Sequence, residues 1–132
     1  MIKGLEVNSE VEARIWQSFN GWAEHFLKNL RSDGLNYLLS KYQELIESLE
    51  ANKHDYSYEY INDLSMRNAI QIILDCLPIE EKQKFYSKIE GLDKRLKAQM
   101  VTSDFICNEK VIHQYPQAVY WWYYGLPKCI EP

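Results

Sequence analysis

The sequence has little glycine, proline or cysteine, and no long run of apolar residues. Five glycines and four prolines among 132 residues are too few for a disordered or fibrous chain. The longest apolar runs fall far short of the roughly 20 residues that span a bilayer. The segment from Met1 to Gly4 lacks the charged and then apolar layout of a signal peptide. We therefore expect a soluble, cytoplasmic protein that makes no membrane contact.

Motifs for metals, phosphates and nucleophilic catalysis are also missing. Cys76, Cys107 and Cys129 form no C-x-x-C pair, and the three histidines form no H-x-x-x-H pattern. The glycines are isolated, so none builds a phosphate-binding loop, and no serine lies in a G-x-S-x-G turn. The sequence thus predicts no metal and no cofactor, and it gives an enzyme no support.

Charge is unevenly distributed along the chain. The formal net charge is −4, and residues 1–77 hold seven basic and twelve acidic side chains. An acidic chain disfavours nucleic acid, whose protein partners usually carry a basic face. An acidic surface suits a basic protein partner, because opposite charge accelerates the encounter. An ordinary solvated surface, which keeps a protein soluble, is the alternative interpretation.

Apolar residues recur at steps of three and four over four segments, which is the spacing of one helix face. Ser9 and Glu12 form a capping box, and Pro78 suits the first position of the last helix. The short turn at 32–34 indicates an antiparallel helix pair. We therefore predict one all-α domain, residues 1–132, with a four-helix up-down bundle over residues 1–100. The expected helices span residues 9–31, 35–51, 60–77 and 78–100.

Residues 101–132 form a tail that is too apolar to remain free in water. Its many aromatic side chains indicate an irregular segment that wraps around the helices and buries about half of its rings. Three prolines, Pro116, Pro127 and Pro132, prevent one long helix. A short helix over residues 117–124, started by Pro116, is expected.

The most unusual polar region lies between the second and third expected helices. We call it the acidic tyrosine face. Tyrosine gives a large contact area at low entropic cost, and neighbouring carboxylates pair with lysine or arginine on a partner. The alternative is a loop whose tyrosines cover the end of the bundle. The candidate partner-binding residues are Asp55, Tyr56, Tyr58, Glu59, Tyr60 and Asp63.

Consecutive aromatic residues in the tail form a second candidate surface. Five neighbouring rings cannot all face one way, so some should be exposed or lie at an interface. They either lock the tail onto the bundle, line a ligand pocket together with Trp16 and Trp22, or form a homodimer seam. Asp93 is expected to anchor the tail or to lie in a surface ion pair. The candidate pocket or interface aromatics are Trp121, Trp122, Tyr123 and Tyr124.

Two short motifs resemble a pattern of small bacterial proteins. Residues 92–96 read LDKRL and residues 121–127 read WWYYGLP. The pattern is a helical domain carrying L-D-x-R-[FL], followed by W-W or W-Y and a proline. Some such acidic proteins resemble immunity proteins of polymorphic toxin or contact-dependent inhibition systems. The resemblance implies a toxin as partner. Gly125-Leu126 stand where such families often have an arginine, and no site residue carries over.

The sequence leads to one main functional hypothesis and to alternatives. We expect a non-enzymatic protein that binds a basic, toxin-like protein through the acidic tyrosine face and blocks its active site. The alternative is a small-molecule-binding or regulatory domain with an aromatic pocket between tail and bundle. Self-association through the tail is a third reading, so both a monomer and a homodimer remain open.

Overall fold

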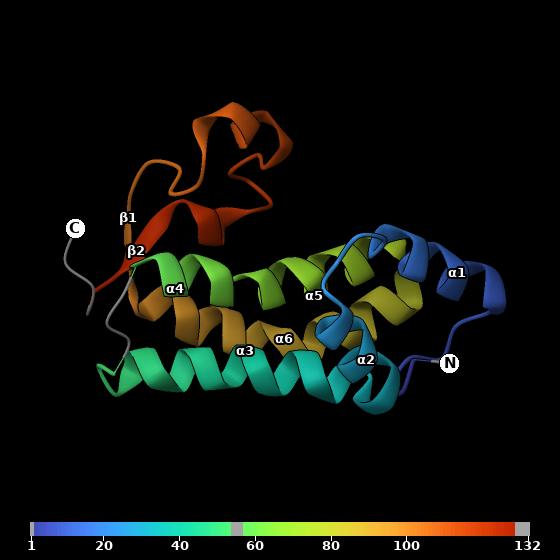
Figure 1. Cartoon of the computed structure of the whole chain (residues 1–132). Coiled ribbons are helices and arrows are strands. Elements are labelled where there is room, and N and C mark those ends of the chain that lie inside the picture. Colours follow the sequence, from blue (N-terminus) through green and yellow to red (C-terminus); the bar gives the residue numbers. More distant parts are fainter. Residues whose placement is uncertain (1, 54–56, 129–132) are drawn as a thin grey trace.

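The fold is mostly helical, as the sequence predicts, with one small sheet (Figure 1). The computed structural model describes residues 2–53 and 57–128. Within these residues none of the helices is both long and apolar enough to cross a bilayer. The α-helices are α1 (Ser9–Ser18), α2 (Glu24–Asp33), α3 (Leu35–Glu50), α4 (Ser57–Asp63), α5 (Ser65–Cys76) and α6 (Ile79–Ala98). The other elements are the strands β1 (Met100–Thr102) and β2 (Gly125–Pro127) and the 3-10 helices η1 (Glu109–Gln114) and η2 (Trp121–Tyr123).

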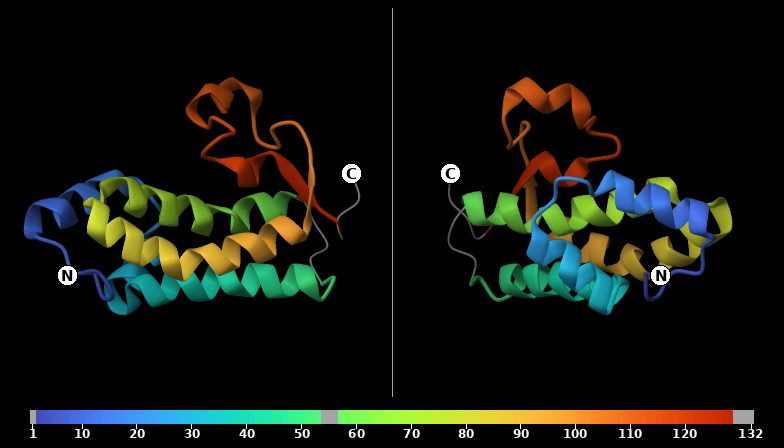
Figure 2. Two further views of the ribbon diagram at one scale, coloured as in Figure 1. Left: turned by 180° about the vertical axis from the view of Figure 1, so that it is seen from behind. Right: turned by 45° about the vertical axis from the view of Figure 1, so that its right-hand side comes forward.

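Three long rods form the body of the molecule. Helix α3 runs one way, α4 and α5 return, and α6 runs back again beside both (Figures 1 and 2). Helix α3 contacts α2, α4, α5 and α6, so its apolar residues lie at the centre of the core. Tyr42, Ile46 and Leu49 on α3 have no exposed surface. The pair α1 and α2 covers the end of the rods that lies farthest from the sheet.

The first predicted helix is divided into α1 and α2. Gly21 has φ of +88°, a conformation that L side chains rarely adopt, and it turns the chain between the two helices. The predicted capping box is wrong by one residue. Asn8 caps α1 by accepting a hydrogen bond from the Val11 amide at 2.9 Å. The Glu12 carboxylate instead accepts a hydrogen bond from the Ile2 amide at 2.5 Å, and so ties the N-terminal segment to α1.

The junction between α2 and α3 consists of one glycine. Gly34 has φ of +62°, and a β-carbon there would lie 2.3 Å from the Lys3 carbonyl oxygen. That carbonyl accepts a hydrogen bond from the Leu35 amide at 2.9 Å. The turn predicted at 32–34 is therefore tighter than expected, because the N-terminal segment packs directly against it.

The third predicted helix is also divided, at Leu64 between α4 and α5. Leu64 keeps helix-like angles of −62° and −15°, so the axis continues after a small break. Helix α6, by contrast, is continuous through Gly91 and agrees closely with its predicted range. Four predicted helices thus become six, and no glycine or proline marks the break at Leu64.

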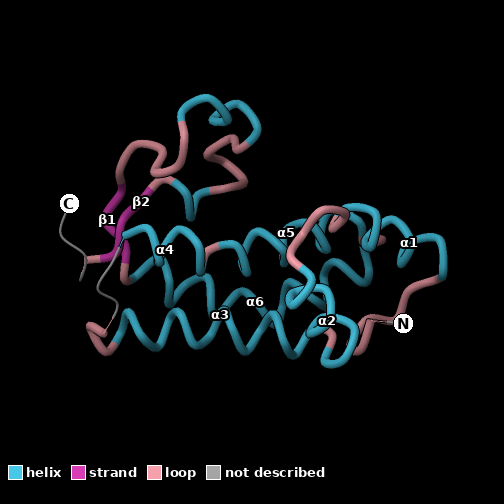
Figure 3. Tube along the Cα trace, viewed as in Figure 1, coloured by secondary structure: helices cyan, strands magenta, loops and turns pink. Residues whose placement is uncertain are grey.

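The tail folds back on itself as a lobe on the α4–α5 side, opposite α3, and does not wrap around the helices (Figures 1 and 3). Strands β1 and β2 pair antiparallel at its base, with Val101 opposite Leu126. Further backbone hydrogen bonds join Ser103 and Ile106 to the chain near η2. The expected helix over 117–124 is replaced by a turn after Pro116 and the short η2.

Candidate functional site

A groove lies between the start of α2, the middle of α3 and the α4–α5 junction. Its volume is about 550 Å³, which is larger than any single amino-acid side chain. Three segments that are distant in the sequence form it, so it depends on the packing of α2 and α4 against α3. We refer to it as the groove. Its floor and sides include Leu45, Ser48, Asn62, Ser65 and Met66.

The α2 side of the groove is aromatic. Trp22 and Phe26 pack with their ring centroids 4.7 Å apart, and Tyr37 of α3 lies 5.8 Å from Phe26. The Phe19 ring packs edge-on against the Trp22 ring, with the two ring centroids 5.1 Å apart. Phe19 and Phe26 are buried, whereas Trp22 and Tyr37 are half-buried. The turn at Gly21 therefore holds the partly exposed Trp22 ring at the groove, and α3 adds the partly exposed Tyr37 ring.

Charged side chains line the rest of the groove. Glu59 and Asp63 come from successive turns of α4, and Glu44 comes from α3. Lys41 and Lys53 add two ammonium groups, and Lys41 pairs with Glu44 at 3.3 Å. That pair is exposed, at 51% and 65% of its side-chain surfaces, so it holds the two groups together only weakly. Carboxylates thus outnumber lysines in the groove by three to two.

The acidic tyrosine face is divided by the structure. Glu59 and Asp63 are exposed and line the groove. Tyr60 has no exposed surface, which corrects its predicted role at a partner contact. Tyr60 lies on the face of α4 that packs against the core, so the polar sequence around it concealed its burial. Asp55, Tyr56 and the side chain of Tyr58 lie outside the described residues.

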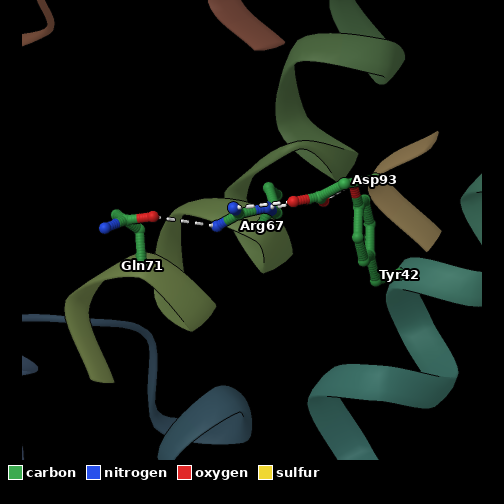
Figure 4. A network of polar contacts seen from close by, with 4 residues as sticks. All are labelled: Tyr42, Arg67, Gln71 and Asp93. Carbon is green, nitrogen blue, oxygen red and sulfur yellow. Dashed lines mark hydrogen bonds and ion pairs between the residues drawn. The ribbon is translucent and has the colours of Figure 1, made fainter. Parts of the chain in front are cut away.

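A buried ion pair joins α5 and α6 beneath the tail (Figure 4). Arg67 and Asp93 are 2% and 5% exposed. The guanidinium donates from Nε and Nη2 to the two carboxylate oxygens, at 2.9 and 3.0 Å. Tyr42 of α3 donates to Asp93 at 2.6 Å, and Arg67 also donates to Gln71 at 3.2 Å. Since the pair is bidentate and has further polar partners, it is a well-satisfied buried pair.

The network also holds the tail. The Arg67 guanidinium lies 4.2 Å from the ring centroid of Trp122, which is completely buried. Burial raises the pKa of the Tyr42 hydroxyl, and the negative charge of Asp93 raises it further. Tyr42 therefore remains a hydrogen-bond donor to Asp93. Asp93 does not bind the tail directly, as one prediction had it, but positions the arginine on which Trp122 packs.

The tail aromatics contribute mainly to packing. Trp122 and Tyr123 are buried, which corrects their predicted role at an exposed pocket or interface. Trp121 and Tyr124 are half-buried. These two rings line a cavity of about 310 Å³ with Lys97, whose ammonium lies 4.5 Å from the Trp121 ring centroid. Only a 3-10 turn forms here in place of the expected helix, and the four rings are nevertheless divided between buried and half-buried positions.

The expected pocket lined by four tryptophans does not form. Trp22 lies in the groove, Trp122 is in the core, and Trp121 lines the tail cavity. Trp16 packs beneath Arg31 at 5.0 Å, near the far end of the molecule. Trp16 on α1, Trp22 in the turn after it and the pair Trp121 and Trp122 on η2 thus lie in separate parts of the fold, and the two rings of η2 point to different surroundings.

Sequence reasoning missed part of the groove. Trp22 was expected to line a pocket with the tail, and no role was predicted for Tyr37, Lys41 or Glu44. The dipeptide Asn20-Gly21 is a turn signal that marks the break and places Trp22 outside a helix. Within residues 2–53 and 57–128 no group of three or more histidine, cysteine or carboxylate side chains is arranged to hold a metal ion.

Comparisons of the chain with protein-family models, with curated proteins and with solved structures found no match. The groove and its chemistry are therefore the basis for assigning a function.

Proposed function

We propose that the chain is a non-enzymatic protein-binding protein that holds a basic segment of its partner in the groove. The supporting observation is that a half-buried aromatic wall faces the carboxylates of Glu44, Glu59 and Asp63 in one concave surface. Aromatic anchors in a pocket with a charged rim are the usual composition of a protein-binding hot spot.

The charge distribution of the chain supports a basic partner. Residues 1–77 carry a net charge of −5, from seven basic and twelve acidic side chains, and they include all of the described residues that line the groove. A field of this sign attracts a basic surface and orients it before contact. In its most specific form, the proposal is that the chain is an immunity protein. The partner is then a toxin domain whose basic active site or substrate groove is covered when the complex forms.

The motifs that carry the family resemblance serve the fold. Asp93 from the first motif and Trp122 from the second meet on either side of Arg67. Arg95 of the first motif pairs with Glu50 of α3 at 2.6 Å. We therefore assign these motifs to the attachment of the tail, and we place partner binding in the groove.

The test compares three forms of the protein as immobilised bait in native cell lysate. A groove triple variant neutralises the groove carboxylates: Glu44→Gln, Glu59→Gln and Asp63→Asn. A matched triple variant makes the same charge change at exposed sites outside the groove: Glu6→Gln, Glu47→Gln and Glu90→Gln.

We expect one basic protein to be retained by the wild type and by the matched triple, to elute with salt, and to be lost by the groove triple. Circular dichroism establishes that all three forms are folded. A stoichiometric amount of the wild-type chain should also inhibit the activity of the purified partner. Retention of the same protein by the groove triple at wild-type strength contradicts the proposal.

The tail cavity supports the small-molecule alternative less well. Two half-buried rings line it, Trp121 and Tyr124, and Lys97 already lies over the Trp121 ring at 4.5 Å. Its volume of about 310 Å³ is near the lower limit of ligand pockets.

A further inference from the structure

At three of the four tryptophans, a lysine or arginine of the chain itself lies over the ring. Arg67 lies over Trp122 at 4.2 Å, Arg31 over Trp16 at 5.0 Å, and Lys97 over Trp121 at 4.5 Å. All three distances are within the roughly 6 Å over which a ring attracts a cation.

Trp22 is the exception. Among the described residues, no lysine or arginine lies over its ring, although the ring is half-buried beside carboxylates in the groove. Two lysines line the same groove, but Lys41 is paired with Glu44 on the α3 side. None of the described groove residues is an arginine.

The core shows what an aromatic ring and a carboxylate can hold together. The two carboxylate oxygens of Asp93 accept hydrogen bonds from Nε and Nη2 of Arg67, and the Trp122 ring lies against the flat face of the same guanidinium. The groove offers the same two kinds of group, with the Trp22 ring on one side and Glu59 and Asp63 on the other. Glu59 and Asp63 are four residues apart on α4, so they share one face of that helix.

We infer that the groove is a receptor for an arginine side chain of the partner, with its guanidinium on the Trp22 ring and its N–H groups toward Glu59 and Asp63. Arginine is favoured over lysine because its planar group both stacks on a ring and donates to carboxylates in a fork, whereas an ammonium is a strongly hydrated point charge. This inference rests on the proposed function and names the partner residue that the groove recognises.

The groove volume of about 550 Å³ exceeds one arginine, so residues beside it in the partner also enter. Tyr37 provides a second half-buried ring for them. A short peptide is therefore a better probe than free arginine.

The experiment titrates the full chain with acetylated tetra-arginine amide and follows the indole N–H signals of the four tryptophans by NMR. The signals are assigned with single Trp→Phe variants at 16, 22, 121 and 122. Two further probes are tetra-lysine and a tetra-citrulline peptide, in which a neutral urea replaces each guanidinium. We expect tetra-arginine to shift the Trp22 signal in a saturable way, tetra-lysine to bind more weakly, and tetra-citrulline to leave the signal in place.

Two sets of variants locate the site. Glu59→Gln with Asp63→Asn should weaken tetra-arginine binding at least about threefold, and Trp22→Leu should do the same, because each removes one of the two contacts. Glu47→Gln, on α3 outside the groove, is the control and should bind as the wild type does. Glu59 and Asp63 are exposed, and circular dichroism establishes that the carboxylate variant is folded, so its result stands even where Trp22→Leu disturbs the fold.

An unmoved Trp22 signal, or equal binding of the arginine and citrulline peptides, overturns the inference. Its failure is distinguishable from failure of the proposed function. If tetra-arginine leaves the Trp22 signal unmoved while the groove triple variant fails to retain the cellular partner, the groove binds that partner by other chemistry. If the partner also remains bound to the groove triple, the groove is not the binding site.

Discussion

At the scale of single residues, Asp93 balances the charge of a buried arginine. Its carboxylate is the only acidic group hydrogen-bonded to Arg67 among the described contacts, and it also accepts from Tyr42. A guanidinium buried without a counter-charge costs several kcal/mol, because the protein interior solvates it poorly. The stability of the core therefore depends on both partners being present.

We expect Asp93→Asn to lower the free energy of unfolding by about 3–5 kcal/mol, since it keeps the shape of the side chain and leaves Arg67 unpaired. Urea denaturation followed by circular dichroism measures the change. Glu50→Gln is the control, because it breaks the exposed pair with Arg95 and should change stability little. Equal losses in the two variants would show that the burial of the Arg67–Asp93 pair has no special cost.

Sequence patterns could not assign these single residues correctly. Tyr60 lies among polar residues, and only the packing of α4 on α3 shows that it is buried. Asp93 lies between lysine and leucine in a charged helix, a context typical of the surface. Its partner Arg67 is 26 residues away, in another helix. Nothing local in the sequence identifies such a pair.

At the scale of elements, uninterrupted helices were predicted well and breaks were predicted poorly. The ranges 35–51 and 78–100 agree closely with α3 and α6, because each has a continuous apolar stripe and a clear end signal. The Asn20-Gly21 dipeptide signals the break, but the apolar stripe continues on both sides of it and so favoured a single helix. The three-residue strands β1 and β2 have too few positions to show alternation, and they exist because the two ends of the tail meet.

Three glycine-to-alanine substitutions test how the elements are joined. Gly34→Ala should destabilise by roughly 3 kcal/mol, because its β-carbon meets the Lys3 backbone and its φ is positive. Gly21→Ala should cost about 1 kcal/mol, since it has the same strain but open space around it. Gly91→Ala, in the exposed middle of α6, should stabilise by about 0.5–1 kcal/mol.

Thermal and urea unfolding measurements rank the three variants by their free energy of unfolding. A Gly34 variant as stable as the Gly21 variant would mean that the N-terminal segment moves aside without cost. A destabilised Gly91 variant would mean that α6 needs a bend there.

At the scale of the whole molecule, the groove and the tail are both products of tertiary packing. The groove draws on a turn, the face of one helix and the end of another, and the tail lies on an arginine of α5. The sequence indicated that acidic and aromatic residues would form the candidate surfaces, and Glu59 and Asp63 are exposed as expected. It could not supply the other residues of the groove, Trp22 and Tyr37, because these lie 37 and 22 positions before Glu59 in the chain.

The stability of the molecule should fall in alkaline solution. Burial raises the pKa of Tyr42 and of Tyr123 above the ordinary value near 10. The unfolded chain releases these protons near pH 10 while the folded chain retains them, so the stability present below about pH 10 is lost as pH rises. We expect the free energy of unfolding to decrease by up to about 1.4 kcal/mol per pH unit for each tyrosine.

Urea unfolding at a series of pH values from neutral to about 11 tests this dependence. Tyr123→Phe removes one of the two groups and should reduce the slope above pH 10, while the stability at neutral pH changes less. Phenolate absorbance supplies a second readout, since the buried tyrosines should ionise only as the chain unfolds. A flat profile up to pH 11 contradicts the expectation.

The network of Tyr42, Arg67, Asp93 and Trp122 also constrains how this sequence can diverge. Its four members come from α3, α5, α6 and the tail, so a change at one site leaves the other three unsuited to each other. Descendants of the same ancestor should keep all four or replace Arg67 and Asp93 together, whereas the exposed pair of Glu50 and Arg95 is free to drift one residue at a time. Under the proposed function the groove should vary differently, because its residues would follow the surface of a partner and not the packing of their own core.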